Sequence, residues 1–434
     1  MTPPPLPSPV LARSVATKHS SWRTSLALLL ALLAPALRAQ DFLDRLDDSL
    51  SFATPGAAAR ARLSGTFDLE GYRLPSPAPA LFDTTRTSLL NPRLTLFLDA
   101  QLGPHAYVFA QARADHGFDP GDGPARRRLD EYALRLTPWS DGRVSLQLGK
   151  FSTIVGNWVN RHGSWENPFV TAPLPYENLT GIWDTEAARS LGQLLLWSHV
   201  RPGLAAANLA NEKHLRVPLL WGPAYTTGLA VSGALGKFRY AAELKNAPLS
   251  SRPTSWTKAQ KWWSYPATSA RLGWVPSPMW DFGVSASTGV YLRPSATRTL
   301  APGTGRGDYR QRTLAADAAF AWHHWQVWAE LFRTRFAIPT VGEAGVLAGY
   351  VEAKYKFTPQ LAASVRWNRQ AYATIPDAAG VPVHWGRDLT RLDFAPAWRF
   401  TVHTQLKLQY SLQREPAAAT TTTHLLAAQL TVRF

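Results

Sequence analysis

The sequence predicts an all-β chain that closes into a transmembrane antiparallel β-barrel of about 18 strands, with 16 as the alternative count. Three observations favour this fold. Apolar and polar residues alternate with a period of two over most of the chain, short and long connections alternate between the strands, and no apolar run reaches the length of a membrane-spanning helix. Because lipid cannot pair with backbone N–H and C=O groups, a β chain crosses a bilayer only as a closed barrel.

The composition excludes several classes of protein. The 434 residues contain no cysteine, which rules out disulfide scaffolds, cysteine-ligated zinc sites and thiol nucleophiles. A charged fraction of 18% with 11% aromatic residues argues against a disordered chain. The net charge of +16 would suit a nucleic acid or an anionic surface. The export signal at the N-terminus argues against a nucleic-acid partner.

The first 39 residues have the organisation of a secretory signal peptide. Basic residues precede a run of 13 apolar residues, SLALLLALLAPAL, and small residues follow it. A membrane-spanning helix needs about 20 residues, so an N-terminal anchor is the less favoured interpretation. Cleavage is expected after Ala39, with Ala36 as the alternative. Residues 40–61 then form an N-terminal periplasmic segment, in which residues 41–52 could be a short amphipathic helix, and residues 62–434 form the barrel.

The strands are paired by tight turns. Residues 93–102 and 106–115 each alternate apolar and polar side chains, and Gly103-Pro104-His105 connects them as a hairpin. Seventeen strands are clear in the sequence, and one of them follows Ser190. A single-chain barrel needs an even number, so residues 204–212 are expected to supply the eighteenth. The tight turns are expected on the periplasmic side and the long connections outside, in strict alternation.

Aromatic residues gather beside the tight turns, where a barrel meets the lipid headgroups. The expected girdle consists of Trp139, Trp274, Trp280, Trp322, Trp325, Trp398 and Phe400. The opposite face of the strands carries charges of both signs, which predicts a polar, water-facing wall. The basic wall residues expected to guide anions are Arg113, Arg135, Arg239, Arg366 and Arg391.

The chain ends in HLLAAQLTVRF, with its apolar residues on one face. Here it resembles Gram-negative outer-membrane proteins, whose last strand typically ends in a phenylalanine that the barrel-assembly machinery recognises. The resemblance implies a location in the cell outer membrane, contact with outer-membrane lipid, and recognition of Phe434 by that machinery. The outward apolar face could contact lipid or pack against the other subunits of a homotrimer, and the sequence does not distinguish these two uses.

The longest connection, residues 152–190, includes GNWVNRHGSWENPF. A long third external loop is where general porins fold back into the lumen, and this chain resembles them in that position. The segments RLDEYALRLTP and QLGKFSTIVGN look like the strand-turn-strand entry of the substrate-selective porin superfamily, which includes phosphate-selective porins. The resemblance implies a pore constriction formed by Arg161, His162, Trp165, Glu166, Tyr176, Glu177 and Arg189. Those basic and acidic residues are mixed, unlike the basic constriction of phosphate-selective members.

The resemblance implies an outer-membrane porin for passive diffusion of small hydrophilic solutes. Removal of the signal peptide leaves 42 basic and 30 acidic residues, a net charge of +12. That excess could give anion preference, or it could reflect an Ala-, Arg- and Pro-rich coding bias. No G-x-S-x-G motif or Gly-rich phosphate loop occurs, and no carboxylate is suitably spaced beside His323-His324. We therefore expect no enzyme activity, cofactor or metal.

The sequence leaves three alternatives open. A structural barrel could sheathe or anchor an export or electron-transfer partner, and it would then pass little current alone. A barrel enzyme would need a cluster of Ser, His and acidic residues at one rim, which the sequence does not supply. A soluble secreted β-protein would appear in the aqueous fraction after lysis rather than in detergent.

Overall fold

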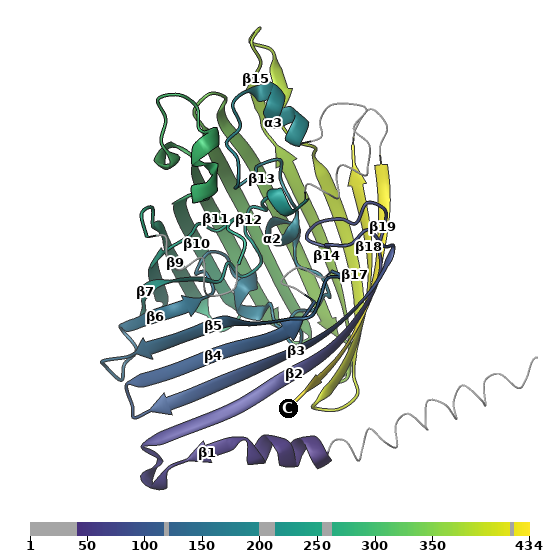
Figure 1. The fold of residues 1–434 in the computed structure, drawn as a ribbon. Coiled ribbons are helices and arrows are strands. Elements are labelled where there is room, and N and C mark those ends of the chain that lie inside the picture. Colours follow the sequence, from purple (N-terminus) through teal and green to yellow (C-terminus); the bar gives the residue numbers. More distant parts are fainter. Residues whose placement is uncertain (1–40, 117–120, 199–212, 254–262, 417–420) are drawn as a thin grey trace, which may run out of the picture.

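The computed structural model describes residues 41–116, 121–198, 213–253, 263–416 and 421–434. The expected signal peptide and the expected strand at residues 204–212 lie outside the described residues. Of the nineteen strands within them, sixteen form one antiparallel sheet that closes on itself (Figure 1). Closure comes from pairing of the last strand with the first barrel strand, with Leu426 opposite Arg73 and Arg433 opposite Thr66. The predicted transmembrane-type β-barrel is confirmed.

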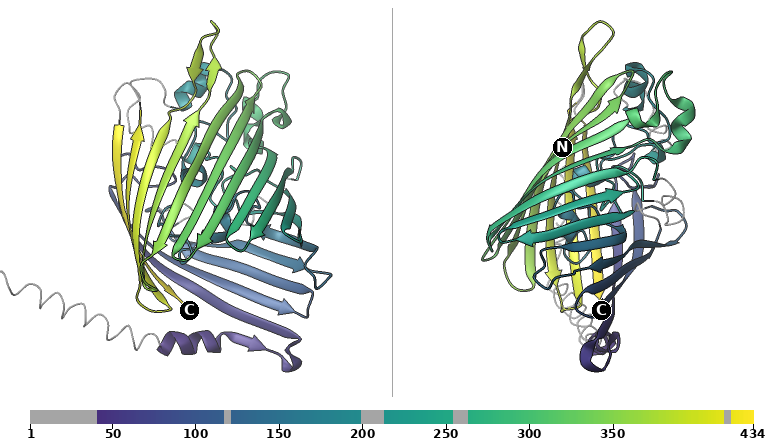
Figure 2. Two further views of the ribbon diagram at one scale, coloured as in Figure 1. Left: turned by 180° about the vertical axis from the view of Figure 1, so that it is seen from behind. Right: turned by 90° about the vertical axis from the view of Figure 1, so that its left-hand side faces the viewer.

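The barrel strands follow one another around the ring in chain order. They are β2 (Ala59–Arg73), β3 (Ser88–Leu102), β4 (Ala106–Asp115), β5 (Arg126–Leu136), β6 (Ser145–Phe151), β7 (Thr226–Leu235), β8 (Phe238–Lys245), β9 (Ala267–Ser277), β10 (Trp280–Val290), β11 (Arg310–Trp322), β12 (Trp325–Ile338), β13 (Gly342–Lys356), β14 (Leu361–Tyr372), β17 (Leu389–Arg399), β18 (Thr404–Glu415) and β19 (Thr421–Arg433). Three strands lie outside the ring: β1 (Ser51–Ala53), β15 (Thr374–Pro376) and β16 (Pro382–His384). The wall is uneven, since the green and yellow-green strands stand taller than the blue ones (Figure 2).

The barrel has 16 strands, the alternative count, and not the favoured 18. The strand expected after Ser190 is instead the helix α3 (Leu191–Trp197), whose first turn is capped by the Ser190 hydroxyl accepting from the amide of Gln193 at 3.2 Å. The apolar run LGQLLLW fits either a strand or a buried helix. A capping serine directly before it favours the helix.

Turn lengths follow the prediction at the periplasmic end and depart from it at two external connections, β12 to β13 and β18 to β19. Gly103 and Gly236 occupy periplasmic turns with φ of +64° and +60°, a conformation that costs glycine little. The external connection between β12 and β13 consists only of residues 339–341. Strict alternation of short and long connections is therefore wrong at this hairpin, which rises as one continuous tall ribbon.

The two faces of the wall differ as predicted. Side chains such as Leu148, Leu272 and Leu314 face outward with 61–64% of their surface exposed. All seven aromatic residues of the expected girdle are exposed, between 38% for Trp280 and 58% for Trp139. The inward face carries Asp, Glu, Arg, Lys, Asn and Gln, most of them buried by the material that fills the lumen. The sheet thus presents an apolar face to lipid and a polar face to the interior.

The N-terminal segment lies across the periplasmic end of the barrel (Figure 1). Residues 41–49 form a helix, and β1 pairs with the start of β2, where Ala53 is opposite Arg60. The Asp44 carboxylate lies 2.7 Å from His403 Nε2 in the turn between β17 and β18. Within the described part of the chain, no helix has the length and apolarity needed to cross a bilayer.

Substitution of Gly65 by valine is expected to destabilise the closure seam. Gly65 and Phe434 exchange backbone hydrogen bonds of 2.9 and 3.0 Å, and a Cβ atom on Gly65 would lie 2.6 Å from the Phe434 ring. Overpacking of this kind costs about 1–3 kcal/mol. The temperature at which the barrel loses its folded gel mobility should fall. Gly71→Val is the matched control, because nothing lies within 4 Å of that site; equal loss in both variants would contradict the seam argument.

Candidate functional site in the barrel lumen

The connection between β6 and β7, residues 152–225, contains segments that fold into the lumen; we call it the lumen loop. Its described parts are residues 152–198 and 213–225, which include the short helix α2 (Leu174–Glu177) and α3. Figure 1 shows α2 within the barrel, in front of the tall strands. The loop is the third external connection, as the resemblance implied, and it extends beyond the predicted end at residue 190 because α3, and not a strand, follows Ser190.

Glu330 on β12 anchors the start of the lumen loop. Its carboxylate accepts hydrogen bonds from the backbone amides of Asn157 and Trp158, the latter at 2.6 Å, and from the Tyr176 hydroxyl at 2.6 Å. Glu330 and Tyr176 are both buried. Hydrogen bonds to a buried carboxylate are stronger than neutral ones, so this one side chain fixes two separate segments of the loop against the wall.

A network of buried charges continues along the wall from β13 to β17. Arg161 of the loop pairs with Glu352 at 2.6 Å, and Arg366 lies 3.6 Å from Glu352 and 2.9 Å from Asp393. Arg391 pairs with Asp393 at 3.1 Å and also with Glu177 of the loop. Arginines and carboxylates alternate along this network, so each charge lies beside an opposite one.

Strand β18 holds the middle of the loop through polar side chains. The Lys407 ammonium, which is fully buried, donates to the backbone carbonyls of Ser164 and Asn167 at 2.6 and 2.9 Å. The Gln409 amide oxygen accepts from the backbone amides of Val170 and Thr171 at 2.7 and 3.0 Å. These bonds satisfy backbone groups that would otherwise be buried without partners.

Apolar packing holds the remaining loop against the tall strands. The largest cluster of buried apolar residues combines loop residues such as Trp158, Leu194 and Trp221 with Phe332 and Phe336 of β12. The Tyr176 ring meets Phe332 edge-on, with 5.6 Å between centroids. Apolar packing therefore fills the lumen beside β12–β14, while polar contacts tie the loop to β5, β8, β17 and β18 as well.

The predicted constriction residues do not all lie at one narrow ring. Arg161, Tyr176 and Glu177 are buried in the anchoring network. Trp165 and Glu166 lie at the periplasmic side of the loop, beside Arg433 and Phe434. Arg189 lies at the external end and donates from Nε to the Thr299 carbonyl at 3.0 Å. Their roles in permeation stay predictions.

The predicted wall residues all face inward, and each has a partner. Arg113 lies 2.9 Å from Asp115, Arg239 lies 3.0 Å from Asp281, and Arg135 donates to the Gln147 side chain at 2.9 and 3.0 Å. Arg366 and Arg391 belong to the anchoring network described above. Arginines whose charge is balanced by a neighbouring carboxylate contribute less to the field in the lumen.

A basic cluster at the periplasmic half of the lumen was not among the predicted site residues. It consists of Lys354 and Lys356 on β13, Arg399 on β17 and Arg433 on β19, which share the inward face. The guanidinium carbons of Arg433 and Arg399 lie 4.1 and 4.9 Å from the Trp165 ring centroid. None of the four forms an ion pair with another described residue. Strand parity could place them inward, but it could not show that they lack carboxylate partners.

His162 in the lumen loop gives the loop a pH dependence. Its Nε2 accepts from the Tyr225 hydroxyl at 2.5 Å and its Nδ1 donates to the Val159 carbonyl at 2.5 Å, an arrangement of the neutral ring. Burial lowers the pKa of His162 to about 4, below its ordinary value of about 6.5. This packing is therefore fully stabilising above about pH 6.5 and is lost as the pH falls through the folded pKa.

We expect the midpoint temperature of thermal unfolding to decrease as the pH is lowered from 6.5 to 4. The decrease should be smaller in His162→Asn, because asparagine cannot become protonated in this range. The measurement is loss of folded gel mobility against temperature at each pH. An equal acid sensitivity in both proteins would contradict this assignment.

The barrel resembles several solved outer-membrane structures. OmpF of Salmonella typhi, in complex with daunomycin, aligns with a TM-score of 0.53 at 11% identity and covers 88% of this chain and 100% of that one. The fold is that of the outer-membrane porins. An anion-selective porin from Comamonas acidovorans aligns with a TM-score of 0.51 at 9% identity, over 87% of this chain and 100% of that one. The outer-membrane channel DcaP of Acinetobacter baumannii gives 0.51 at 10% identity, over 88% and 99%.

No family model matches the sequence, and no curated protein matches it. At 9–11% identity the porin structures establish this chain as an outer-membrane-type barrel and nothing about individual residues. The site residues above therefore rest on this chain's own geometry.

Proposed function

We propose that the protein is an outer-membrane channel through which small hydrophilic solutes diffuse passively, with a preference for anions. The observation that carries the proposal is the closed barrel with a polar inner face and a third external loop anchored inside it by Glu330 and the buried charge network. A loop fixed inside a lumen narrows the path without needing any chemical step. Binding along such a path must be weak enough for solutes to leave.

The preference for anions is inferred from the basic cluster of Lys354, Lys356, Arg399 and Arg433. Charges that lack an ion-pair partner within the described residues attract counter-ions, and the low-dielectric wall around a lumen strengthens the attraction. Four of the five predicted wall arginines form ion pairs, and Arg135 binds the neutral Gln147 side chain. The basic cluster is therefore the stronger candidate for setting selectivity.

The selectivity is tested by the reversal potential of the purified protein in a planar bilayer under a salt gradient. Wild type should give the sign for anion preference. The variant Lys354→Gln/Lys356→Gln/Arg399→Gln should shift the reversal potential toward zero or past it. Arg143→Gln/Lys237→Gln, which removes basic residues from two periplasmic turns, is the control and should behave as wild type. A cation-preferring wild type, or an unchanged triple variant, would contradict the assignment.

A further inference from the structure

Charged residues on the outward face of the barrel are distributed unevenly. Outward arginines lie toward the external ends of their strands, as with Arg73 on β2, Arg127 on β5 and Arg414 on β18. On the described barrel strands, Glu343 is the one acidic residue that faces outward. A charge that faces the bilayer midplane destabilises a barrel, and this cost becomes small near the interface. The external end of the wall is therefore basic where it reaches the outer headgroups.

The densest group of outward arginines lies on two neighbouring strands. Arg312 of β11 is directly opposite Arg335 of β12, and Arg333 lies two residues along the same face, opposite Leu314. Like charges directly opposite across strands repel. Glu343 lies 3.3 Å from Arg312 and 2.8 Å from Arg335. Arg333 forms no ion pair with any described residue, so three positive charges face one negative charge.

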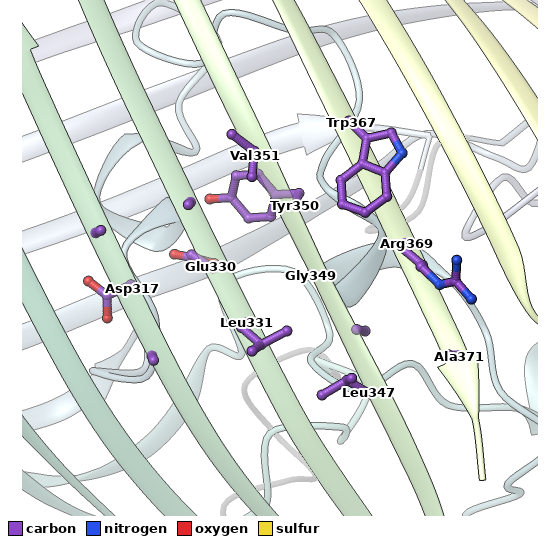
Figure 3. A pocket seen from close by; sticks show the side chains of 14 residues that line it. Asp317, Glu330, Leu331, Leu347, Gly349, Tyr350, Val351, Trp367, Arg369 and Ala371 are labelled. Atoms are coloured by element: carbon purple, nitrogen blue, oxygen red, sulfur yellow. The ribbon is translucent and has the colours of Figure 1, made fainter.

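Shallow grooves flank this arginine group. On one side the groove is lined by Thr268, Ala270, Ala286 and Thr288, outward residues that are small and leave room along the wall. A second groove lies farther from the external end of the strands, where Leu331, Leu347 and Trp367 surround Gly349 and Arg369 lies beside it (Figure 3). Leu331, Leu347 and Trp367 are 46–52% exposed. An anionic group at the arginines would therefore lie above apolar grooves that suit acyl chains.

We propose that Arg312, Arg333 and Arg335 bind the phosphate groups of a lipid of the outer leaflet, whose acyl chains lie in the grooves below. Guanidinium groups match phosphate oxygens in geometry as well as charge. A second copy of this chain fits less well, because its described outer wall offers no acidic residue other than Glu343 to meet the arginines. The inference does not depend on whether the barrel conducts.

The test is calorimetric titration of the purified full chain in detergent with lipopolysaccharide that retains its lipid A phosphates. Arg333→Gln/Arg335→Gln should weaken binding roughly tenfold or more, because each basic residue near an anionic lipid surface contributes about 1 kcal/mol. Arg333→Lys should keep most of the affinity. Arg73→Gln/Arg414→Gln removes two outward arginines on another part of the wall and should bind as wild type. Heat-modifiable gel mobility verifies that each variant is folded.

Three results would overturn the proposal. They are equal binding of lipopolysaccharide after removal of its phosphates, unchanged binding by Arg333→Gln/Arg335→Gln, and inorganic phosphate competing at the same concentration as the lipid. A fourth result would assign the surface to a second copy of the chain. In sedimentation, wild type would form an oligomer and Arg333→Gln/Arg335→Gln would not, while the two proteins would bind the lipid equally.

Discussion

Replacement of Arg366 by alanine is expected to lower the free energy of unfolding by about 3–5 kcal/mol, the usual cost of removing one partner from a buried ion pair. The Arg366 side chain has no exposed surface, lies 2.9 Å from Asp393 and donates to the Thr171 carbonyl of the lumen loop at 3.1 Å. Its guanidinium also lies 4.2 Å from the Phe169 ring centroid. Alanine would leave the Glu352 and Asp393 carboxylates buried with fewer positive neighbours.

Equilibrium urea unfolding of the refolded protein measures this loss. Arg414→Ala on β18 is the matched control, since that side chain is exposed on the outward face, and its loss should fall within about 0.5 kcal/mol. An Arg366→Ala loss no larger than that of the control would show that the buried network does not hold the loop.

Replacement of Glu330 by alanine is expected to release the start of the lumen loop from the wall. The channel should then spend a larger fraction of the recording in states of higher conductance. The substitution removes the acceptor of three hydrogen bonds, from Asn157, Trp158 and Tyr176. Since a hydrogen bond to a charged group contributes about 1.5–3 kcal/mol, loss of even one should shift the loop equilibrium at least about tenfold. Single-channel recordings should show frequent transitions to larger conductance.

Glu343→Ala on the neighbouring strand is the matched control, because that carboxylate is exposed on the outward face. Its traces should match those of wild type. If Glu330→Ala also retains wild-type conductance and noise, the loop does not depend on this anchor and the proposed narrowing of the lumen would be wrong.

Much of the fold could be predicted because side chains on a strand alternate between two environments with opposite polarity. The alternation predicted an inward position for Arg366 and Arg391, and the structure has both buried there. It failed after Ser190, where a short apolar run gives no period that separates a strand from a helix. The strand count depended on that one segment, which is why 18 was favoured over 16.

The candidate site was less accessible to prediction than the fold. The position of the loop in the chain suggested that it enters the lumen, but parity cannot tell which inward charges it neutralises. Arg161 was expected at an open constriction, yet it is buried against Glu352 and stacks 4.3 Å from the Trp328 ring. These contacts join residues about 190 positions apart in the chain, and only the closed three-dimensional arrangement sets them.

The central claim, that this barrel is a conducting channel, is tested most directly by recording the purified wild-type protein in a planar bilayer with a salt gradient across it. The account predicts stable ohmic current steps and a reversal potential of the sign for anion preference. A barrel that is folded by its heat-modifiable gel mobility, yet passes no current in either orientation, would contradict it.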